Sequence, residues 1–221
     1  MCQNCFDSKS VARRVLLAQR RALSKAESQR LSACIQSDVL TLTEWRLART
    51  VALYVSVRNE VATDLLLDAA WGTGKKVLLP RCLPSERGEG LMEFALCPGR
   101  DFLAPASFGI LEPIPICPAI GQIEGGADDA AAGEEMNRMG KTPQESAGLC
   151  DLIIVPGVGF NPAGYRIGYG MGFYDRLLNR PGWAAVRRIG LAYGFQIADF
   201  PSDPHDRPMH ACVTEKEILC F

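Results

Sequence analysis

The chain has 221 residues, with 24 lysines and arginines against 25 acids, and is 48% hydrophobic and 22% charged. This composition is typical of one globular α/β domain, and the balanced charge excludes a general attraction to nucleic acid or to anionic membranes. No apolar run approaches a length of about 18 residues, which is needed to span a bilayer. Residues 1–7 also lack the apolar centre of a secretory signal. We therefore expect a cytoplasmic protein.

Residues 9–30 predict two consecutive basic helices. They combine a helical pattern of apolar residues with a single acid, Glu27. Ser24 followed by Glu27 is typical of a capping box, so we expect the helices to break near Leu23. A basic, acid-poor start is also typical of an organellar transit peptide, which leaves an organellar pool open. Three arginines of this segment are expected on its solvent-exposed face: Arg14, Arg20 and Arg21.

Downstream of this N-terminal helical pair, the sequence alternates between strand and helix patterns, with a helix predicted at 63–70. Strands separated by helices need crossover connections, which indicates a largely parallel sheet with helices on both faces. We expect a single α/β domain over residues 1–221, with ligands at the carboxyl ends of its strands. Buried strands are predicted at 50–56, 76–80, 92–97, 151–155 and 188–193.

Residues 117–149 predict an insertion in this domain. The segment is rich in glycine, alanine and acids and has no regular apolar periodicity, which is typical of a flexible surface loop. We expect the insertion to take no part in catalysis. Its removal is expected to leave the fold intact.

The chain has nine cysteines, an odd number, and they are not arranged as the framework of a disulfide-rich protein. Cys34, Cys150 and Cys212 have apolar neighbours and are predicted to be small core residues. Cys2 and Cys5 form one C-x-x-C motif. Without a second pair or a nearby histidine, this motif does not predict a zinc site.

A glycine-rich stretch at 161–175, N-P-A-G-Y-R-I-G-Y-G-M-G-F-Y-D, follows the apolar run at 151–155. Glycine lets the backbone turn several N–H groups towards one anion, and Arg166 adds a forked cation that suits a phosphate. The spacing matches neither G-x-x-x-x-G-K-[ST] nor the dinucleotide-binding G-x-G-x-x-G pattern, and such runs also occur in turns and bulges. The stretch favours a phosphate or nucleotide site of another kind. Its glycines are Gly164, Gly168, Gly170 and Gly172.

Further motifs accompany this loop: K-S-V-A-R at 9–13, E-V-A-T at 60–63 and P-S-D-P-H-D at 201–206. In this order they resemble the 5-formyltetrahydrofolate cyclo-ligase family, also called methenyltetrahydrofolate synthetases, from Lys9 to Glu215 except near 117–149. The resemblance implies ATP-dependent cyclisation of 5-formyltetrahydrofolate to 5,10-methenyltetrahydrofolate, with release of ADP and phosphate. It also implies a phosphorylated formyl group, an iminium phosphate, as the intermediate.

The resemblance assigns roles to residues of these motifs. It implies Lys9 and Arg166 as catalytic residues, and Asp175 and Asp206 as ligands of Mg²⁺, an ion that prefers carboxylate oxygens. The residues that it implies for ATP binding are Lys9, Arg13, Arg166, Ile167, Gly168, Tyr169, Gly170, Met171, Gly172, Phe173 and Tyr174. Those that it implies for the folate are Arg13, Val57, Glu60, Tyr169, Gly170, Met171, Gly172 and Phe173.

The chain departs from the family's pattern within E-V-A-T, where the family usually has a second acid and this chain has Ala62. One expected substrate contact is therefore missing. Tyr169 and Met171 also stand where some related chains carry basic or small residues. The only histidines, His205 and His210, are expected to have no catalytic role, because the implied chemistry needs little proton transfer by the enzyme.

Other functions remain open from the sequence. A sugar-phosphate isomerase or CoA-transferase-like enzyme shares this layout without using ATP, and Ala62 is compatible with a folate-binding relative that has lost turnover. The balanced charge and the lack of an RNA-binding motif disfavour an RNA-associated relative. We expect a monomer whose partner is 5-formyltetrahydrofolate, with or without a polyglutamate tail, rather than nucleic acid or a membrane.

Overall fold

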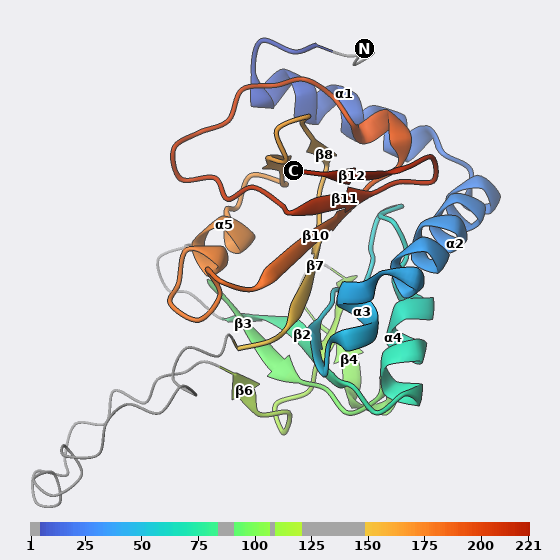
Figure 1. Cartoon of the computed structure of the whole chain (residues 1–221), viewed down its shortest axis with the longest axis vertical. Coiled ribbons are helices and arrows are strands. Elements are labelled where there is room, and N and C mark those ends of the chain that lie inside the picture. Colours follow the sequence, from blue (N-terminus) through green and yellow to red (C-terminus); the bar gives the residue numbers. More distant parts are fainter. Residues whose placement is uncertain (1–4, 84–90, 107–108, 121–148) are drawn as a thin grey trace, which may run out of the picture.

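The structure, a computed structural model, describes residues 5–83, 91–106, 109–120 and 149–221. Within these residues, an eight-stranded sheet forms the centre of the molecule (Figure 1). Its strands from β11 to β2 are parallel, and the strands outside them are antiparallel, which confirms the largely parallel α/β sheet. From one edge to the other, the strands are β12 (Ile218–Cys220), β11 (Ala211–Val213), β10 (Arg187–Leu191), β7 (Leu152–Pro156), β1 (Thr50–Ala52), β2 (Lys76–Leu83), β3 (Leu91–Leu96) and β6 (Ala119–Ile120).

The parallel strands are buried on both faces, because alternate residues of a strand enter different cores. In β7, Leu152 and Ile154 belong to one hydrophobic core, whereas Ile153 and Val155 belong to another. All four side chains are fully buried. A strand that is covered on both faces consists of a continuous apolar run, which explains why β7 is recognisable in the sequence.

Helices cover both faces of the sheet, as expected (Figure 1). The first core takes its helical side chains from the three helices that lie together on one face, and the second takes them from a single short helix. Among the described residues, no helix is both long and apolar enough to cross a bilayer. The helices of the first face are α2 (Lys25–Thr41), α3 (Thr43–Leu47) and α4 (Asp64–Gly72), and the helix of the second face is α5 (Phe173–Leu178).

The first helix, α1 (Lys9–Ala22), lies across one end of the sheet (Figure 1). Its buried residues Ala12 and Leu16 pack with Val158 and Ile167 in a third, smaller core beside a short β-hairpin. The strands of this hairpin are β8 (Gly159–Phe160) and β9 (Arg166–Ile167), and the remaining short elements are η1 (Arg100–Phe102), β4 (Leu103–Pro105), β5 (Leu111–Pro113) and η4 (Gly194–Gln196).

The break between α1 and α2 falls where the sequence predicts it. Leu23 caps the end of α1, and the side chain of Ser24 accepts a hydrogen bond from Glu27 N at 3.1 Å at the start of α2. The Glu27 carboxylate instead accepts hydrogen bonds from Arg30 at 2.9 and 3.0 Å. The N-terminal helical pair is therefore confirmed. Of the predicted capping box, the bond to the Ser24 side chain is present, while the Glu27 side chain pairs with Arg30.

The strand predicted at 50–56 is shorter in the structure. β1 ends at Ala52, although Leu53 N still donates to Leu78 O at 2.9 Å. The chain then leaves the sheet and turns through Arg58 and Asn59, whose φ angles are 51° and 57°. The residues before this turn have the same β propensity as a strand, so local sequence does not mark the point where pairing stops.

Two of the three predicted core cysteines, Cys150 and Cys212, are buried, but Cys34 is exposed, so the prediction for Cys34 is wrong. Helix α2 buries the face that carries Leu31 and Ile35, and Cys34 lies on another face of the helix. Its apolar neighbours in sequence are thus not its neighbours in space. The C-x-x-C motif lies partly outside the described residues, because residues 1–4 are not among them.

Most of the insertion predicted at 117–149 lies outside the described residues, which end at 120 and resume at 149. Its two ends are part of the fold. Ala119 and Ile120 form β6, which pairs with β3, and Leu149 N donates to Gly182 O at 3.2 Å. The role of the insertion stays a prediction.

Candidate active site

The glycine-rich loop lies beyond the carboxyl end of β7. The chain passes through the β8–β9 hairpin, whose second strand begins at Arg166, and continues through residues 168–172 to the start of α5. Gly170 and Gly172 have φ angles of 104° and 65°, which residues with a Cβ rarely adopt. These glycines give the loop its shape and leave its backbone free of bulky side chains.

Gly164 has a different role from the other glycines of the motif. It forms the turn of the β8–β9 hairpin, where its N–H donates to Asn161 O at 2.9 Å and its carbonyl accepts from Met209 N at 2.8 Å. A Cβ at Gly164 would meet the ring of Phe221 at 2.8 Å. The turn and the close contact explain this glycine without a ligand.

A pocket with a volume of about 390 Å³ lies beside the loop. Every residue to which the family resemblance assigns a role lines this pocket, although these residues come from four separate segments of the chain. Their individual roles remain predictions. The residues are Lys9, Arg13, Val57, Glu60, Arg166, Ile167, Gly168, Tyr169, Gly170, Met171, Gly172, Phe173, Tyr174, Asp175 and Asp206.

Arg166 is buried in the pocket wall and forms an ion pair with Asp175. Its Nη2 lies 2.8 Å from Asp175 Oδ1, and its guanidinium carbon lies 5.3 Å from the centroid of the Tyr174 ring. Its Nε is buried and has no hydrogen-bond partner among the described residues. A buried guanidinium with an unused donor is suited to an anion that enters the pocket.

Two cations reach the pocket from α1. Lys9 Nζ donates to Asp203 Oδ2 at 2.6 Å and also to Asp206 Oδ2. Burial lowers the pKa of Lys9, but the hydrogen bonds and charges of the two carboxylates outweigh it and raise the pKa. Arg13 Nε donates to Gly168 O at 2.7 Å. Helix α1 is therefore fastened both to the glycine-rich loop and to the loop that carries Asp206.

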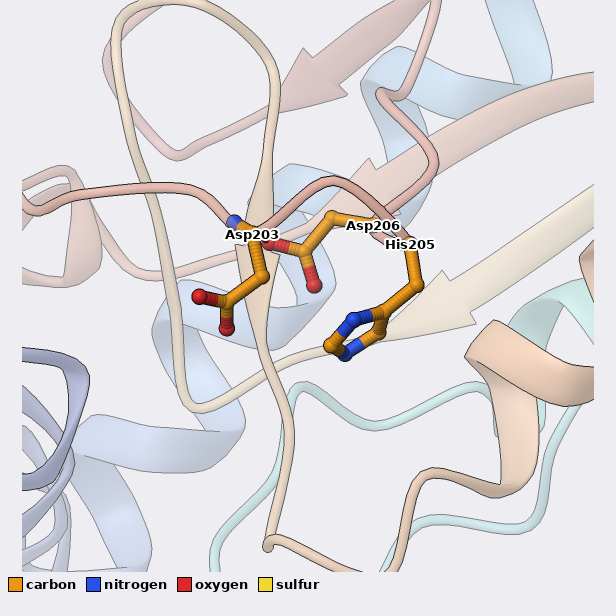
Figure 2. A group of neighbouring side chains, drawn as sticks. All are labelled: Asp203, His205 and Asp206. Atoms are coloured by element: carbon orange, nitrogen blue, oxygen red, sulfur yellow. Dashed lines mark hydrogen bonds between the residues drawn. The ribbon is translucent and has the colours of Figure 1, made fainter.

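Asp203, His205 and Asp206 form a group of possible metal ligands in the pocket wall (Figure 2). Their ligand atoms lie within 4.8 Å of one another, and the three side chains point to the same side of their loop. Asp206 is buried and also accepts a hydrogen bond from Asp203 N at 2.7 Å. Asp175 lines the same pocket but pairs with Arg166. These carboxylates are donors of the kind that Mg²⁺ prefers, so they fit the predicted ion.

Glu60 enters the pocket wall from the turn after β1 and is 8% exposed. Its Oε2 accepts a hydrogen bond from Val57 N at 3.1 Å. Burial raises the pKa of Glu60. The positive charge of Arg20, the hydrogen bond from Val57 N and the interaction with Tyr169 act in the opposite direction and favour the ionised form.

The departure from the family's pattern at Ala62 lies outside the pocket wall. Ala62 N donates to Ser32 Oγ at 3.0 Å on the side of α2, and this residue is not one of those that line the pocket. Among the residues of the E-V-A-T motif, Glu60 is the one that lines the pocket.

The prediction that Arg20 lies on a solvent-exposed face with Arg14 and Arg21 is wrong for Arg20. Arg14 and Arg21 are exposed, whereas Arg20 is 1% exposed. Ala12, Leu16 and Arg20 follow one another at intervals of four residues and form the buried stripe of α1. This spacing is the sequence signal that identifies Arg20 as a buried residue.

Part of the pocket wall is apolar and has no motif in the sequence. Pro80 and Cys82 come from β2, Met92 comes from β3, and Ile110 precedes β5. In the sequence, such residues are indistinguishable from ordinary core residues, because packing decides which of them face a cavity. Burial raises the pKa of Cys82 to about 12, so its thiol is protonated near neutral pH.

The fold and the pocket define a class of protein: an α/β protein in which a glycine-rich loop, cations and carboxylates meet beyond the carboxyl ends of a largely parallel sheet. Comparison with known families makes this assignment more specific. The model of the 5-formyltetrahydrofolate cyclo-ligase family matches residues 6–128 and 129–215. The chain belongs to this family, which confirms the resemblance seen in the sequence.

Individual relatives agree over nearly the whole chain. The 5-formyltetrahydrofolate cyclo-ligase of Mycolicibacterium smegmatis is 30% identical over 216 residues, which cover 95% of this chain and 94% of the relative. The mouse enzyme of the same name is 27% identical over 202 residues, which cover 87% of each chain. The NMR structure of Aquifex aeolicus 5,10-methenyltetrahydrofolate synthetase superposes with a TM-score of 0.72 at 30% identity, covering 96% of this chain and 92% of that chain.

Proposed function

We propose that the chain catalyses the ATP-dependent cyclisation of 5-formyltetrahydrofolate to 5,10-methenyltetrahydrofolate, with release of ADP and phosphate. The observation that carries this proposal is that all residues assigned from the family's motifs line one pocket. Cations, carboxylates and the glycine-rich loop share this pocket with Glu60 and with an apolar wall. A charged co-substrate and a heteroaromatic substrate therefore each have suitable surroundings in one cavity.

The reaction needs phosphoryl transfer because a formyl amide is a poor electrophile. The formyl oxygen attacks the γ-phosphorus while the bond to ADP breaks, which gives the iminium phosphate. N10 then adds to the formyl carbon and loses its proton, and the C–O bond breaks as phosphate leaves. The task of the protein in such a reaction is to position the reactants and to stabilise the charge that develops.

Arg166 and Lys9 are the cations that we assign to this charge. Arg166 is held by Asp175 and the Tyr174 ring, and Lys9 is held by the loop that carries Asp206. Side chains that are fixed in advance stabilise developing charge without reorganising during the reaction. The backbone of residues 168–172 and Arg13 would hold the phosphates. Bound Mg²⁺ would neutralise part of the phosphate charge, with the carboxylates of Asp175 and Asp206 as its protein ligands.

On the folate side, we assign Glu60 to the N–H donors of the pterin ring. An ionised carboxylate accepts two hydrogen bonds from neighbouring donors, and the buried position strengthens them. Cys82, Met92 and Ile110 provide an apolar wall for the aromatic part of the substrate. We further infer a cytoplasmic monomer that accepts the folate with or without a polyglutamate tail.

The test is to record the near-ultraviolet absorbance of methenyltetrahydrofolate with purified protein, 5-formyltetrahydrofolate and Mg²⁺, in the presence and absence of ATP. An ATP-dependent rise supports the proposed reaction. A rise without nucleotide would contradict it and favour an enzyme that uses its anion loop differently. If the folded protein binds ATP or the folate but forms no product, it is a binding relative without turnover.

A further inference from the structure

Arg20 is a fully buried cation next to the candidate active site. Its guanidinium donates to Gly157 O at 3.4 Å and to the hydroxyl of Tyr169, and its Nε has no hydrogen-bond partner among the described residues. Arg20 does not itself line the pocket. A buried guanidinium is costly unless a nearby negative charge compensates it, so its position at this depth needs a reason.

Tyr169 connects Arg20 to Glu60. The Tyr169 hydroxyl accepts a hydrogen bond from Arg20, and the interaction of this side chain with the Glu60 carboxylate lowers the pKa of Glu60. The centroid of the Tyr169 ring lies 5.3 Å from the guanidinium carbon of Arg20. A hydroxyl has a single proton, so with Arg20 as the donor on one side, the tyrosine proton is available to the Glu60 carboxylate. The three side chains form a chain in which Arg20 compensates the charge of Glu60.

A second contact joins the same two parts of the molecule. Asn59 Nδ2 donates to the backbone oxygens of Arg20 at 3.3 Å and of Leu23 at 3.1 Å. These carbonyls belong to the C-terminal end of α1, where Arg20 O also accepts from Leu23 N at 3.3 Å. The turn that carries Glu60 is therefore fastened to α1 at the level of Arg20, by a contact that is independent of Tyr169.

We propose that Arg20 is a positioning residue of the active site, which acts through Tyr169 to hold the Glu60 carboxylate in place and to couple the folate-binding turn to the glycine-rich loop. The inference rests on the proposed function, because it takes Glu60 as a contact of the folate. Tyr169 belongs to the glycine-rich loop and lines the pocket together with Glu60, the residue assigned to the folate. An ordered loop and an ordered Glu60 therefore depend on the same hydroxyl.

The charge of Arg20 also sets the pH range in which Glu60 is ionised. Burial raises the pKa of Glu60, and Arg20 is the strongest influence in the opposite direction. Removing Arg20 raises the pKa of Glu60 further. Folate binding needs the ionised carboxylate, so on acidification the variant loses folate binding at a higher pH than the wild type does. Among the described residues, the charged and titratable groups that influence Glu60 are Arg20, Arg58, Tyr54, Tyr169 and Tyr174, and the Tyr193 hydroxyl donates to Glu60 O at 3.2 Å.

The first test is Tyr169→Phe, which removes the bridging hydroxyl and keeps the ring. We expect the KM for 5-formyltetrahydrofolate to rise about tenfold, as for the loss of one hydrogen bond to a charged group, with a smaller change in kcat. The KM for ATP is expected to change less than the KM for the folate. Arg21→Met is the control for replacing an arginine of α1, because Arg21 follows Arg20 in the helix but is exposed. This variant is expected to behave as the wild type.

The second test compares the pH dependence of the KM for the folate in Arg20→Met and Arg20→Lys. In Arg20→Met, the pH below which the KM rises is expected to move upwards, and in Arg20→Lys, which keeps the charge, it is expected to move back towards the wild type. A residue with a merely structural role would lower stability without moving this profile. Circular dichroism and thermal unfolding show whether each variant is folded, and if neither arginine variant folds, Tyr169→Phe decides.

The outcomes separate this inference from the proposed function. If the wild type turns over and the folded Tyr169→Phe variant has an unchanged folate KM, the inference is wrong while the proposed function stands. If the wild type does not turn over, calorimetric titration with 5-formyltetrahydrofolate replaces the KM, and weaker binding by Tyr169→Phe supports the inference. A wild type that neither binds nor converts the folate overturns both.

Discussion

Lys9, in the first turn of α1, binds the carboxylates of Asp203 and Asp206, which lie close to the other end of the chain. Arg166 and Asp175 form a second ion pair, at 2.8 Å. Each carboxylate assigned to magnesium is thus paired with a cation assigned to the phosphates. On binding of Mg²⁺ and ATP, the carboxylates would exchange their cation for the metal and the cations would exchange their carboxylate for phosphate. No buried charge would be left without a partner, which keeps the cost of the exchange low.

Replacing Lys9 by methionine is expected to weaken the use of ATP. The substitution keeps a long side chain and removes the charge, so the KM for ATP should rise about tenfold, in proportion to the loss of one charge-assisted contact. Steady-state kinetics at saturating folate measure this change. Lys25→Met is the control, because Lys25 is exposed at the start of α2. A KM for ATP equal to that of the wild type would remove Lys9 from the nucleotide site.

The same variant gives a prediction for the pH dependence of stability. The hydrogen bond and the charge of Lys9 lower the pKa of Asp203 below its usual 3.8. The stability that Asp203 gains from this pair is therefore fully present above pH 3.8 and is lost as the pH falls through the lowered pKa. The pKa of Lys9 is raised above 10.5, so its contribution is present below that pH and is lost as the pH rises through the raised pKa. The difference in Tm between the wild type and Lys9→Met should therefore form a plateau between these limits and shrink outside them. Thermal unfolding followed by circular dichroism across this range is the measurement, and a difference that does not vary with pH would show that the ion pair does not cause it.

The loop could be predicted from the sequence because its signals are local. Gly170 and Gly172 are needed by the backbone of the loop itself, and Arg166 lies within the same stretch. The limits of α1 and α2 are equally local, since Ser24 caps a helix that begins at the next residue. Features of this kind depend on residues that are close in sequence. This is why the position of the glycine-rich loop and the limits of the first two helices could be predicted.

The remaining features depend on contacts between distant residues. The hydrogen bond from Arg20 to Tyr169 spans 149 positions, and a basic residue in a basic helix gives no hint of such a partner. Cys34 is exposed because of the direction in which α2 packs, not because of its neighbours in sequence. Similarly, Met92 faces the pocket only because β3 pairs with β2 in this register, in which Met92 lies opposite Cys82.

Replacing Arg166 by alanine is expected to lower kcat about 100-fold, because the variant lacks a preorganised cation at the site of charge development. Asp175 would then keep its carboxylate without its partner, so some loss of stability is also expected. Arg180→Ala is the matched control, since Arg180 is exposed beyond the end of α5. Single-turnover kinetics with saturating ATP separate the chemical step from binding. An unchanged rate in the folded variant would exclude Arg166 from catalysis.

Replacing Asp206 by asparagine is expected to raise the Mg²⁺ concentration needed for half-maximal activity by about tenfold or more, because a neutral amide is a weaker ligand than a carboxylate. The comparison with Asp203→Asn shows whether the more exposed carboxylate of the same group also binds Mg²⁺. Direct calorimetric titration of the nucleotide-bound protein with Mg²⁺ gives a readout that does not depend on turnover. If Asp206→Asn leaves the magnesium dependence unchanged, Asp206 acts only as the partner of Lys9.

Replacing residues 121–148 by a Gly/Ser linker about a quarter as long is expected to preserve both the fold and the activity. Both flanks have their own contacts, since β6 pairs with β3 and Leu149 N donates to Gly182 O at 3.2 Å. Shortening the segment to a quarter of its length lowers the entropy cost of closing it by about 1 kcal/mol, so the Tm should stay the same or rise slightly. Thermal unfolding and kcat/KM for the folate measure the two properties. A folded variant without activity would show that the segment contributes to the site, because the flanks would then be intact while the chemistry is lost.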